Sequence, residues 1–536
     1  MVAPVYTTDL ADITTAETIT GWSALGGGQA GLSDETDFFI QGTQCVSKSG
    51  FTADTKGIIF SAGATTITAG DAVFGWAKQN NRNLMDIVAN GGAQLLIGDG
   101  TGDFDQFYID GSNSEGSALA GWRTYAVDPT ATPSATTGAP AATTFFGFQW
   151  AILGSGSLKG SPNGIDVIRH GREIRATDGD LANGYATFDG AAVFDSATTR
   201  AWGLLTPIQG GYLFHGHLVL GQAATPVDFR DSNVSIIVLD DAFVSATFNE
   251  ISIVDASSNV EWSNVQLTHL GTTSPTTLNL NVGTFVGDVC RFDGAGITTF
   301  SSGQTCTNTT WAGSDQVISA GATLNGSSFN NYSGAANTSA LLHNVATDPD
   351  GEFDDCSFLM GATATHAIEF GLTSPLTMTL RGCDFTGYGS TNNANDSVFH
   401  IKRTTGTVTI NLVGCSTDGA FSYRTDGATV VTVIDPVTTL IKVVDAVTKA
   451  NIVGARVLVT ADGATGPLAD GAVVISGVTD SNGEITDSRT LASNQPITGR
   501  VRHSTTPGSL YKTGDIVGTI SSVSGFSTTV QLISDE

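Results

Sequence analysis

The sequence has little charge, few cysteines and no long apolar run. Of its 536 residues, 14% are charged and 40% are hydrophobic, which describes a folded chain rather than a disordered one. It contains no run of about 18 apolar residues, so we predict no membrane-spanning helix and no membrane partner. The 65 glycines follow no G-X-Y period, which excludes collagen. The abundance of Thr, Ser, Gly, Val, Asn and Asp is typical of short strands and tight turns.

Basic residues are scarce as well. The chain carries 51 acidic and 23 basic side chains, a formal net charge of −28. An acidic surface without a basic stripe repels phosphate backbones, so we expect no nucleic-acid partner.

The six cysteines form neither a CxxC motif nor a metal-ligand spacing, and we expect free thiols of a protein made in a reducing cytosol. Residues 1–21 hold three acidic residues, no Lys or Arg and no apolar core, so we expect no secretory signal peptide. The chain also lacks GxxxxGK[ST], HExxH and GxSxG, which argues against an NTPase, a metalloprotease and an α/β-hydrolase. We therefore expect no cofactor, apart from calcium as discussed below.

The first 225 residues divide into three predicted parts. Residues 1–128 alternate short apolar runs with glycine turns, which predicts an antiparallel β-sandwich. Within it, residues 121–127 resemble a late strand of lectin sandwiches. Residues 129–144 are rich in Pro, Ala and Thr without an apolar period, and predict a linker or exposed loop. Residues 145–225 predict a further β-rich shoulder domain.

A degenerate repeat fills residues 226–436: a small residue, any residue, then an aromatic. Its instances are Cys290-Arg291-Phe292, Thr309-Thr310-Trp311, Ser327-Ser328-Phe329, Cys356-Ser357-Phe358 and Cys383-Asp384-Phe385. A period of roughly 18–30 residues suits one coil of a parallel β-helix, where stacked coils bury an apolar face that no single coil can bury. The stretch resembles the right-handed, pectin-lyase-like β-helices of phage tail spikes and polysaccharide lyases. An antiparallel sandwich with aromatic corners is the alternative.

Residues 437–536 predict a separate domain. Strand-like runs surround Thr479-Asp480-Ser481-Asn482-Gly483, where Asp480 and Gly483 suit a tight turn. This order of strands resembles carboxypeptidase-regulatory-like and related Ig-like sandwiches, which are non-catalytic modules. The predicted fold is thus all-β: an N-terminal β-sandwich, a central right-handed parallel β-helix and a C-terminal Ig-like β-sandwich.

Two carboxylates are candidates for catalysis. A glycoside hydrolase or polysaccharide lyase on a β-helix needs acid and base groups in one lateral groove. Aligning the Cys356 and Cys383 coils without gaps, a shift of 27 residues, places Glu369 beside Asp396. A chain so rich in Asp produces such pairs by chance, so our main expectation is a protein without enzymatic activity.

Two acidic segments are candidates for structural calcium, because Ca²⁺ prefers several oxygen ligands. One comprises Asp348, Asp350, Glu352 and Asp354, the other Asp99, Asp103 and Asp105. A solvated acidic turn explains either segment equally well.

Aromatic side chains on a β-helix flank can stack on sugar rings. The candidates are Trp262, Trp311, Tyr332 and Tyr388, although core packing is the simpler explanation for each.

These features together favour a structural protein on the surface of a bacteriophage particle, released by lysis. We expect a tail spike, tail fibre or head fibre that trimerises and contacts host surface polysaccharide or other virion proteins. A capsid decoration protein and a β-helix polysaccharide depolymerase are the alternatives, followed by a non-viral adhesin.

Overall fold

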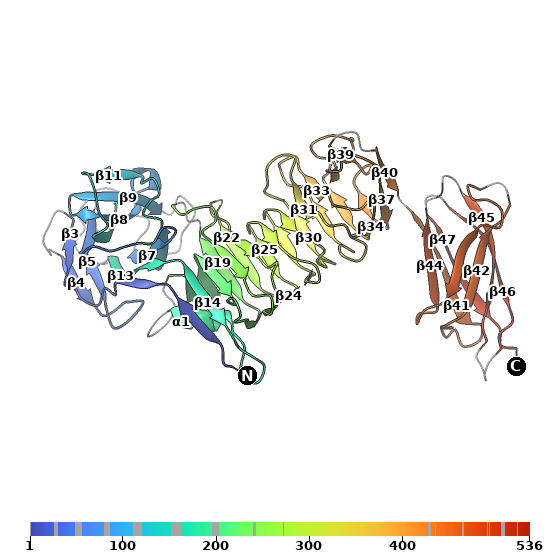
Figure 1. Ribbon diagram of the computed structural model, residues 1–536, viewed down its shortest axis with the longest axis horizontal. Helices are drawn as coiled ribbons and strands as arrows, with labels where there is room; N and C mark the ends of the chain where they lie inside the picture. The colour runs from blue at the N-terminus through green and yellow to red at the C-terminus, as the bar shows by residue number, and fades with distance from the viewer. Residues whose placement is uncertain are drawn as a thin grey trace. The chain divides into compact units, whose positions relative to one another are not determined.

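The computed structural model consists almost entirely of strands and turns, which confirms the predicted all-β class (Figure 1). Contacts divide the chain into two compact units, Met1–Leu342 with Leu359–Thr365, and His343–Phe358 with His366–Glu536. No helix within the described ranges is long and apolar enough to cross a membrane. The structure describes residues 2–25, 31–48, 56–79, 86–110, 121–151, 163–195, 203–239, 243–271, 273–426, 430–434, 436–463, 466–489, 491, 494–504, 510–521 and 524–535.

The first unit begins with two antiparallel sheets that share one core, as predicted for an N-terminal sandwich. Tyr125 of one sheet packs against Phe148 of the other, with ring centroids 5.8 Å apart. One sheet has the order β10 (Gly121–Val127), β7 (Ala72–Gln79), β13 (Asn163–Gly171), β5 (Cys45–Lys48), β4 (Leu32–Glu35), with β2 (Ala11–Thr14) on β13. The other has the order β11 (Ala135–Thr137), β9 (Asp103–Asp110), β8 (Ala93–Gly100), β12 (Phe145–Trp150), β6 (Lys56–Ser61), β3 (Trp22–Ala24), and η2 (Val88–Asn90) precedes β8 in the chain.

The sandwich extends beyond the boundary predicted at residue 128. The segment predicted as a linker, 129–144, contains β11, which pairs with β9. Strands β12 and β13, placed by the sequence in a shoulder domain at 145–225, lie inside the two sheets of the sandwich. β11 lies at the edge of its sheet and is held by backbone pairing, and none of its three side chains is fully buried. Its sequence therefore shows no alternation of apolar residues from which a strand could be predicted.

Parallel coils follow in the first unit, and they start at β14 rather than at residue 226. Each coil contributes strands to parallel sheets, so this part of the chain is a parallel β-helix (Figure 1). One sheet runs β14 (Glu173–Thr177), β17 (His217–Leu220), β20 (Glu250–Ile253), β23 (Thr277–Asn279), β26 (Thr298–Thr299), β29 (Val317–Ile318), β31 (Ser339–His343), with β1 (Val5–Thr8) antiparallel to β14. The second runs β16 (Gly211–Phe214), β19 (Ser235–Leu239), β22 (Gln266–Leu270), β25 (Arg291–Asp293), β28 (Thr310–Ala312), β30 (Ser328–Asn330), with β15 (Leu205–Ile208) antiparallel to β16. The third runs β18 (Asp228–Ser232), β21 (Asn259–Ser263), β24 (Thr284–Asp288), β27 (Thr305–Thr307).

The predicted small-x-aromatic repeat forms columns inside these coils. Phe292 is in register with Trp311, and Trp311 with Phe329. The rings of Trp311 and Phe329 stack with centroids 5.0 Å apart and an interplanar angle of 2°. All three aromatic rings are buried, as are the small residues two positions before them. Alternate residues of a strand point to opposite faces, so one motif places both its first and third side chains in the core.

The second unit contains further coils with the same geometry. Phe358 and Phe385 stack with ring centroids 5.2 Å apart. The strands are β32 (Ser357–Leu359), β33 (His366–Phe370), β34 (Thr377–Arg381), β35 (Asp384–Thr386), β36 (Phe399–Ile401), β37 (Thr407–Val413), β38 (Ser416–Thr417), β39 (Tyr423–Thr425) and β40 (Val430–Ile434). Within this unit β33-β36-β39, β34-β37-β40 and β35-β38 pair in parallel.

The C-terminal part of the second unit is the predicted sandwich. The turn at Asp480 has the expected chemistry: its Oδ1 accepts hydrogen bonds from the backbone N–H groups of Asn482 and Glu484, and Gly483 has φ 72°. One sheet has the order β44 (Glu484–Arg489), β41 (Val437–Asp445), β47 (Phe526–Leu532). The other has the order β43 (Val473–Val478), β42 (Arg456–Ala461), β45 (Gln495–Arg502), β46 (Gly514–Ile520).

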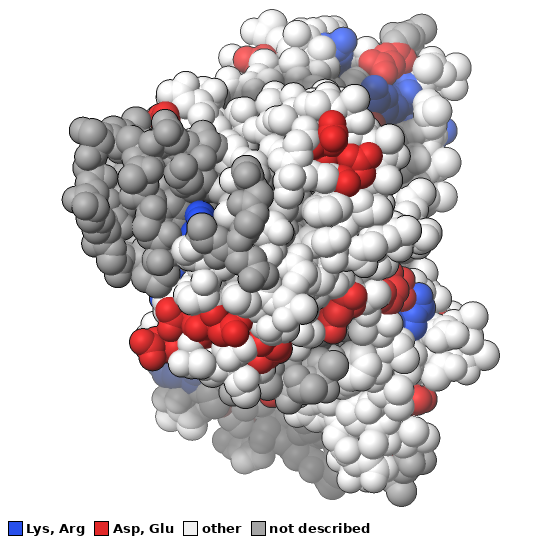
Figure 2. Space-filling model, turned by 90° about the vertical axis from the view of Figure 1, so that its left-hand side faces the viewer, with Lys and Arg blue, Asp and Glu red and all other residues white. Residues whose placement is uncertain are grey.

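The low charge content is visible on the molecular surface. Figure 2, viewed from the side of the N-terminal sandwich, shows Asp and Glu in separate groups on a mostly uncharged surface, with fewer Lys and Arg.

The aromatic column predicts a large cost for its truncation. We expect Phe329→Ala to destabilise the coils by about 3–5 kcal/mol, since it removes a buried ring and leaves a cavity under Trp311. Leu270→Ala, at a position 55% exposed in the same β-helix, should change stability by less than about 0.5 kcal/mol. The stability of both variants can be measured by amide hydrogen exchange of β28 and β30 in urea. Equal losses in the two variants would contradict the column.

Candidate functional site

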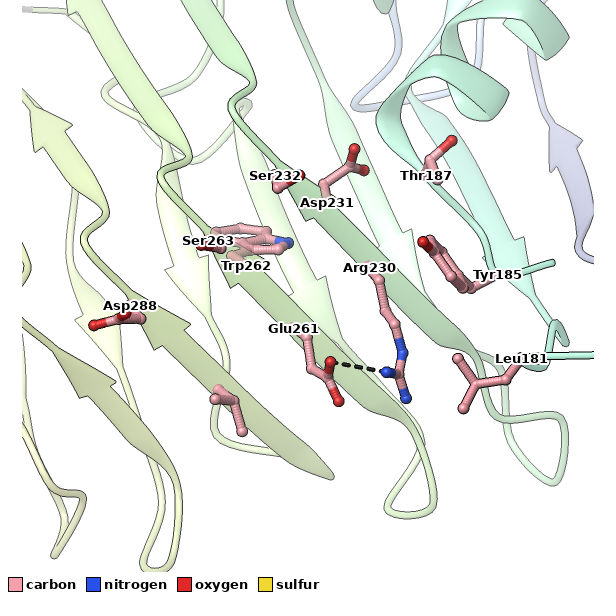
Figure 3. Close-up of a pocket in the computed structure, with 11 residues that line it drawn as sticks. Leu181, Tyr185, Thr187, Arg230, Asp231, Ser232, Glu261, Trp262, Ser263 and Asp288 are labelled. Carbon is pink, nitrogen blue, oxygen red and sulfur yellow. Dashed lines mark ion pairs between the residues drawn. The ribbon is translucent and has the colours of Figure 1, made fainter.

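A pocket of about 550 Å³ lies on the flank of the first unit's β-helix, over strands β18, β21 and β24 (Figure 3). We call it the flank pocket. It combines aliphatic, aromatic, hydroxyl and charged side chains, drawn from the three strands and from the segment before α1 (Phe188–Asp195). The lining residues are Leu181, Tyr185, Thr187, Arg230, Asp231, Ser232, Glu261, Trp262, Ser263, Val286 and Asp288.

Strand register brings the charged groups of the flank pocket together. Arg230 on β18 is directly paired with Glu261 on β21, and its Nη1 lies 2.9 Å from Glu261 Oε2. Its Nε donates to Asp228 Oδ1 at 2.7 Å, and this hydrogen bond raises the pKa of Arg230. The Tyr185 ring centroid lies 5.8 Å from the guanidinium carbon. The guanidinium is therefore held by two carboxylates and one aromatic ring.

The Asp231 carboxyl group bonds to the backbone at the start of α1 and has a raised pKa. It occupies the register position next to Trp262 of the following coil. Its Oδ2 accepts a hydrogen bond from the backbone N–H of Phe188 at 2.7 Å, which satisfies an unpaired donor in the first turn of α1. Burial raises the pKa of Asp231 to about 7, and the nearby negative charge of Asp189 adds to this effect. Near neutral pH this carboxyl can therefore exchange a proton.

The aromatic group that the flank pocket exposes is Tyr185, which the sequence did not single out. Tyr185 is 41% exposed. Trp262, predicted to stack on glycans, lines the pocket but is only 2% exposed and packs edge-on against Phe285. Because a strand buries every second side chain, the aromatic positions of the repeat face the core, whereas Tyr185 lies outside the repeat.

The other three predicted stacking residues are also buried. Trp311 belongs to the aromatic column, and burial raises the pKa of Tyr388. The hydroxyl of Tyr332 bonds to Thr338 Oγ1 at 2.9 Å. The structure thus places them as packing residues.

Glu369 and Asp396, the predicted catalytic pair, are not neighbours across the coils. Glu369 pairs with His400, a shift of 31 residues rather than the 27 of a gapless alignment. The backbone carbonyl of Asp396 instead accepts from Gly389 N–H, within a turn of its own coil. The extra residues lie in the loop between β35 and β36, whose length the repeat does not determine.

A different polar cluster surrounds Glu369. His400 Nδ1 lies 3.5 Å from Glu369 Oε2, and its Nε2 lies 2.9 Å from Asp426 Oδ1. Lys402 Nζ lies 3.1 Å from Asp426 Oδ2 and 4.0 Å from Glu369 Oε2. The buried His366 ring lies 4.8 Å from His400, and burial lowers the pKa of His366 to about 4. These contacts link side chains of three successive coils.

The first predicted calcium segment uses its carboxylates to hold the next coil. Asp350 accepts two hydrogen bonds from Arg381, at 2.6 and 3.1 Å, and Asp348 Oδ1 accepts from Thr379 N–H at 2.7 Å. Asp354 Oδ1 accepts from a backbone N–H of its own turn at 3.3 Å. Burial raises the pKa of Glu352 to about 7.

The second predicted calcium segment fastens residues 135–141 to its sheet. Asp99 Oδ2 and Asp103 Oδ1 accept from the N–H groups of Ala141 and Ala139 at 3.0 Å, and Asp105 Oδ1 accepts from a threonine hydroxyl at 2.7 Å. Across the described part of the chain, no group of three or more His, Cys, Asp or Glu residues is arranged to hold a metal ion.

The fold and the flank pocket define a parallel β-helix protein with a polar and aromatic site on its side. No family model and no curated protein matches the chain. The solved structures it is similar to include the catalytic domain of Agl-KA, at 11% identity and TM-score 0.19, with 80% of this chain and 99% of that chain covered. Another is the catalytic domain of GH87 α-1,3-glucanase in complex with nigerose, at 8% identity and TM-score 0.17, with 80% and 86% covered. TM-scores this low support no conclusion about this chain.

The raised pKa of Asp231 predicts a specific pH dependence. Between about pH 4 and 7 the folded state binds a proton at Asp231 that the unfolded state releases, so stability falls as the pH rises through this window. Asp231→Asn removes the proton exchange, while the amide oxygen can still accept from Phe188. We expect the Tm of this variant to fall less steeply than that of the wild type between pH 5 and 8. The corresponding difference in the free energy of unfolding is about a few kcal/mol at most.

The variant should still lose some stability as the pH rises, because burial also raises the pKa values of Asp166 and Glu352 to about 7. An Asp231→Asn protein with the full wild-type slope in thermal unfolding would contradict this assignment.

Proposed function

We propose that this protein binds an extended polysaccharide along the flank of its β-helix, with one sugar residue in the flank pocket. The observation that carries the proposal is the combination in one pocket of the exposed Tyr185 ring and the fixed Arg230–Glu261 pair. Sugar rings present an apolar face that stacks on aromatic rings, and hydroxyl groups that need oriented donors and acceptors. The pocket offers both.

The setting that we propose is the surface of a bacteriophage particle, as a tail spike, tail fibre or head fibre. The supporting features are stacked coils joined to sandwich domains and an acidic, sparsely basic sequence. We further propose a homotrimer, because β-helix flanks expose strand surfaces that self-association can cover. Its partners would be host surface polysaccharide and other virion proteins.

Stacking on Tyr185 predicts a loss of glycan binding on its removal. We expect Tyr185→Ala to weaken binding to a polysaccharide isolated from the host surface about tenfold, which corresponds to about 1.4 kcal/mol. Phe39→Ala is the matched control, because Phe39 is also 41% exposed but lies in the N-terminal sandwich. Affinity electrophoresis measures both. Equal binding by both variants would refute the site.

The position on the particle is tested by copy number. Gel densitometry of purified particles should give a few copies per particle for a spike or fibre, relative to the major capsid protein. Hundreds of copies would identify a capsid decoration protein instead, and absence from particles would contradict the virion setting. Light scattering of the isolated protein tests the trimer.

Glycoside cleavage is the second candidate function, and Asp231 favours it. A carboxyl with a pKa of about 7 can donate a proton at neutral pH, and Glu261, which pairs with Arg230, lines the same pocket as a second carboxyl group. We expect Glu261→Gln to lower cleavage of the bound polysaccharide by about 10²-fold or more. Glu369→Gln, which changes one member of the predicted catalytic pair, should not lower it. Release of reducing ends measures the activity, and loss in Glu369→Gln alone would move the active site there.

A further inference from the structure

The charges of the flank pocket are unbalanced. The carboxyl groups of Glu261 and Asp288 line it against one guanidinium, that of Arg230, and Asp231, whose pKa burial raises to about 7, adds only part of a negative charge near neutral pH. Asp228, whose Oδ1 lies 2.7 Å from Arg230 Nε, is a further carboxylate beside this guanidinium. The pocket therefore has a negative field, and low-dielectric walls strengthen such a field relative to open water.

The positive charge of Arg230 is already neutralised within the protein. Its Nε and Nη1 atoms lie 2.7 and 2.9 Å from oxygens of Asp228 and Glu261. The Tyr185 ring lies over the guanidinium. An anionic ligand would have to compete with these two carboxylates at hydrogen-bond distance, whereas a hydroxyl group can bond to the remaining N–H donors without displacing either.

The carboxylate of Asp288 is held on the other side of the pocket. Its Oδ1 accepts from Asn308 Nδ2 at 2.9 Å and from Thr307 Oγ1 at 3.2 Å, both neutral groups on the next coil. These bonds fix the carboxylate in position, and neither brings a positive charge to it. Acceptors fixed in this way suit ligand hydroxyl or ammonium donors.

We infer that the flank pocket takes a sugar residue without negative charge and rejects uronic acids and other acidic sugars. This inference rests on the proposed polysaccharide binding and names the class of sugar. Unpaired like charge is an effective means of discrimination, because the rejected ligand loses hydration without gaining a partner.

The test uses matched oligosaccharides of the bound polysaccharide that differ only in oxidation of one C6 hydroxymethyl group to a carboxylate. We expect the full-length protein to bind the oxidised form at least tenfold more weakly in 50 mM salt. In 500 mM salt the difference should shrink severalfold, because screening weakens the repulsion. This comparison uses the wild-type chain, so it does not depend on the folding of a variant.

Glu261→Gln provides the second measurement. It removes one carboxylate and releases part of the Arg230 charge, so the ratio of neutral to acidic affinity should fall about tenfold. Asp37→Asn, which removes one exposed charge in the N-terminal sandwich, should leave the ratio unchanged. Equal affinity of the wild type for both oligosaccharides, or equal ratios in the two variants, would overturn the selectivity while the binding proposal stands. Failure to bind either oligosaccharide would overturn both.

Discussion

The structure depends on the in-register stacking of successive coils. One coil has too few neighbours to bury its aromatic side chain, whereas Trp311 between Phe292 and Phe329 is closed above and below. Parallel pairing holds the strands about 4.8 Å apart, which suits stacked rings. The repeat is therefore maintained by packing between coils rather than by contacts within one coil.

The same stacking creates the flank pocket. Outward-facing residues of successive coils also form columns, and the column of Arg230 and Glu261 places opposite charges side by side. Before β18, the first strand of this sheet, the described part of the chain adds only isolated bridges, such as that of Ala186 with Phe229, and no further strand. Asp231 occupies that end position and bonds to α1, which covers it. The raised pKa of this carboxyl is thus a consequence of closing the end of the coils.

Sequence and structure agree best where burial alternates along strands. The small-x-aromatic motif predicted the columns, because a residue type repeated at a buried position needs a matching residue in the next coil. The turn at Asp480 was also predictable, since it depends only on local hydrogen bonding. The pairing of Glu369 with Asp396 failed because it required loop lengths that the repeat does not specify.

The sequence by itself determined the all-β class, the coiled architecture and the identity of the buried columns, because each follows from the alternation of apolar residues along short strands. Only the tertiary structure decided which polar side chains meet. Tyr185, Arg230 and Asp288 are separated by irregular loops, and none belongs to the repeat. Whether these side chains lie close together depends on the number of residues between the strands. Outward-facing positions are not constrained by core packing, so the sequence shows no pattern from which their neighbours could be predicted.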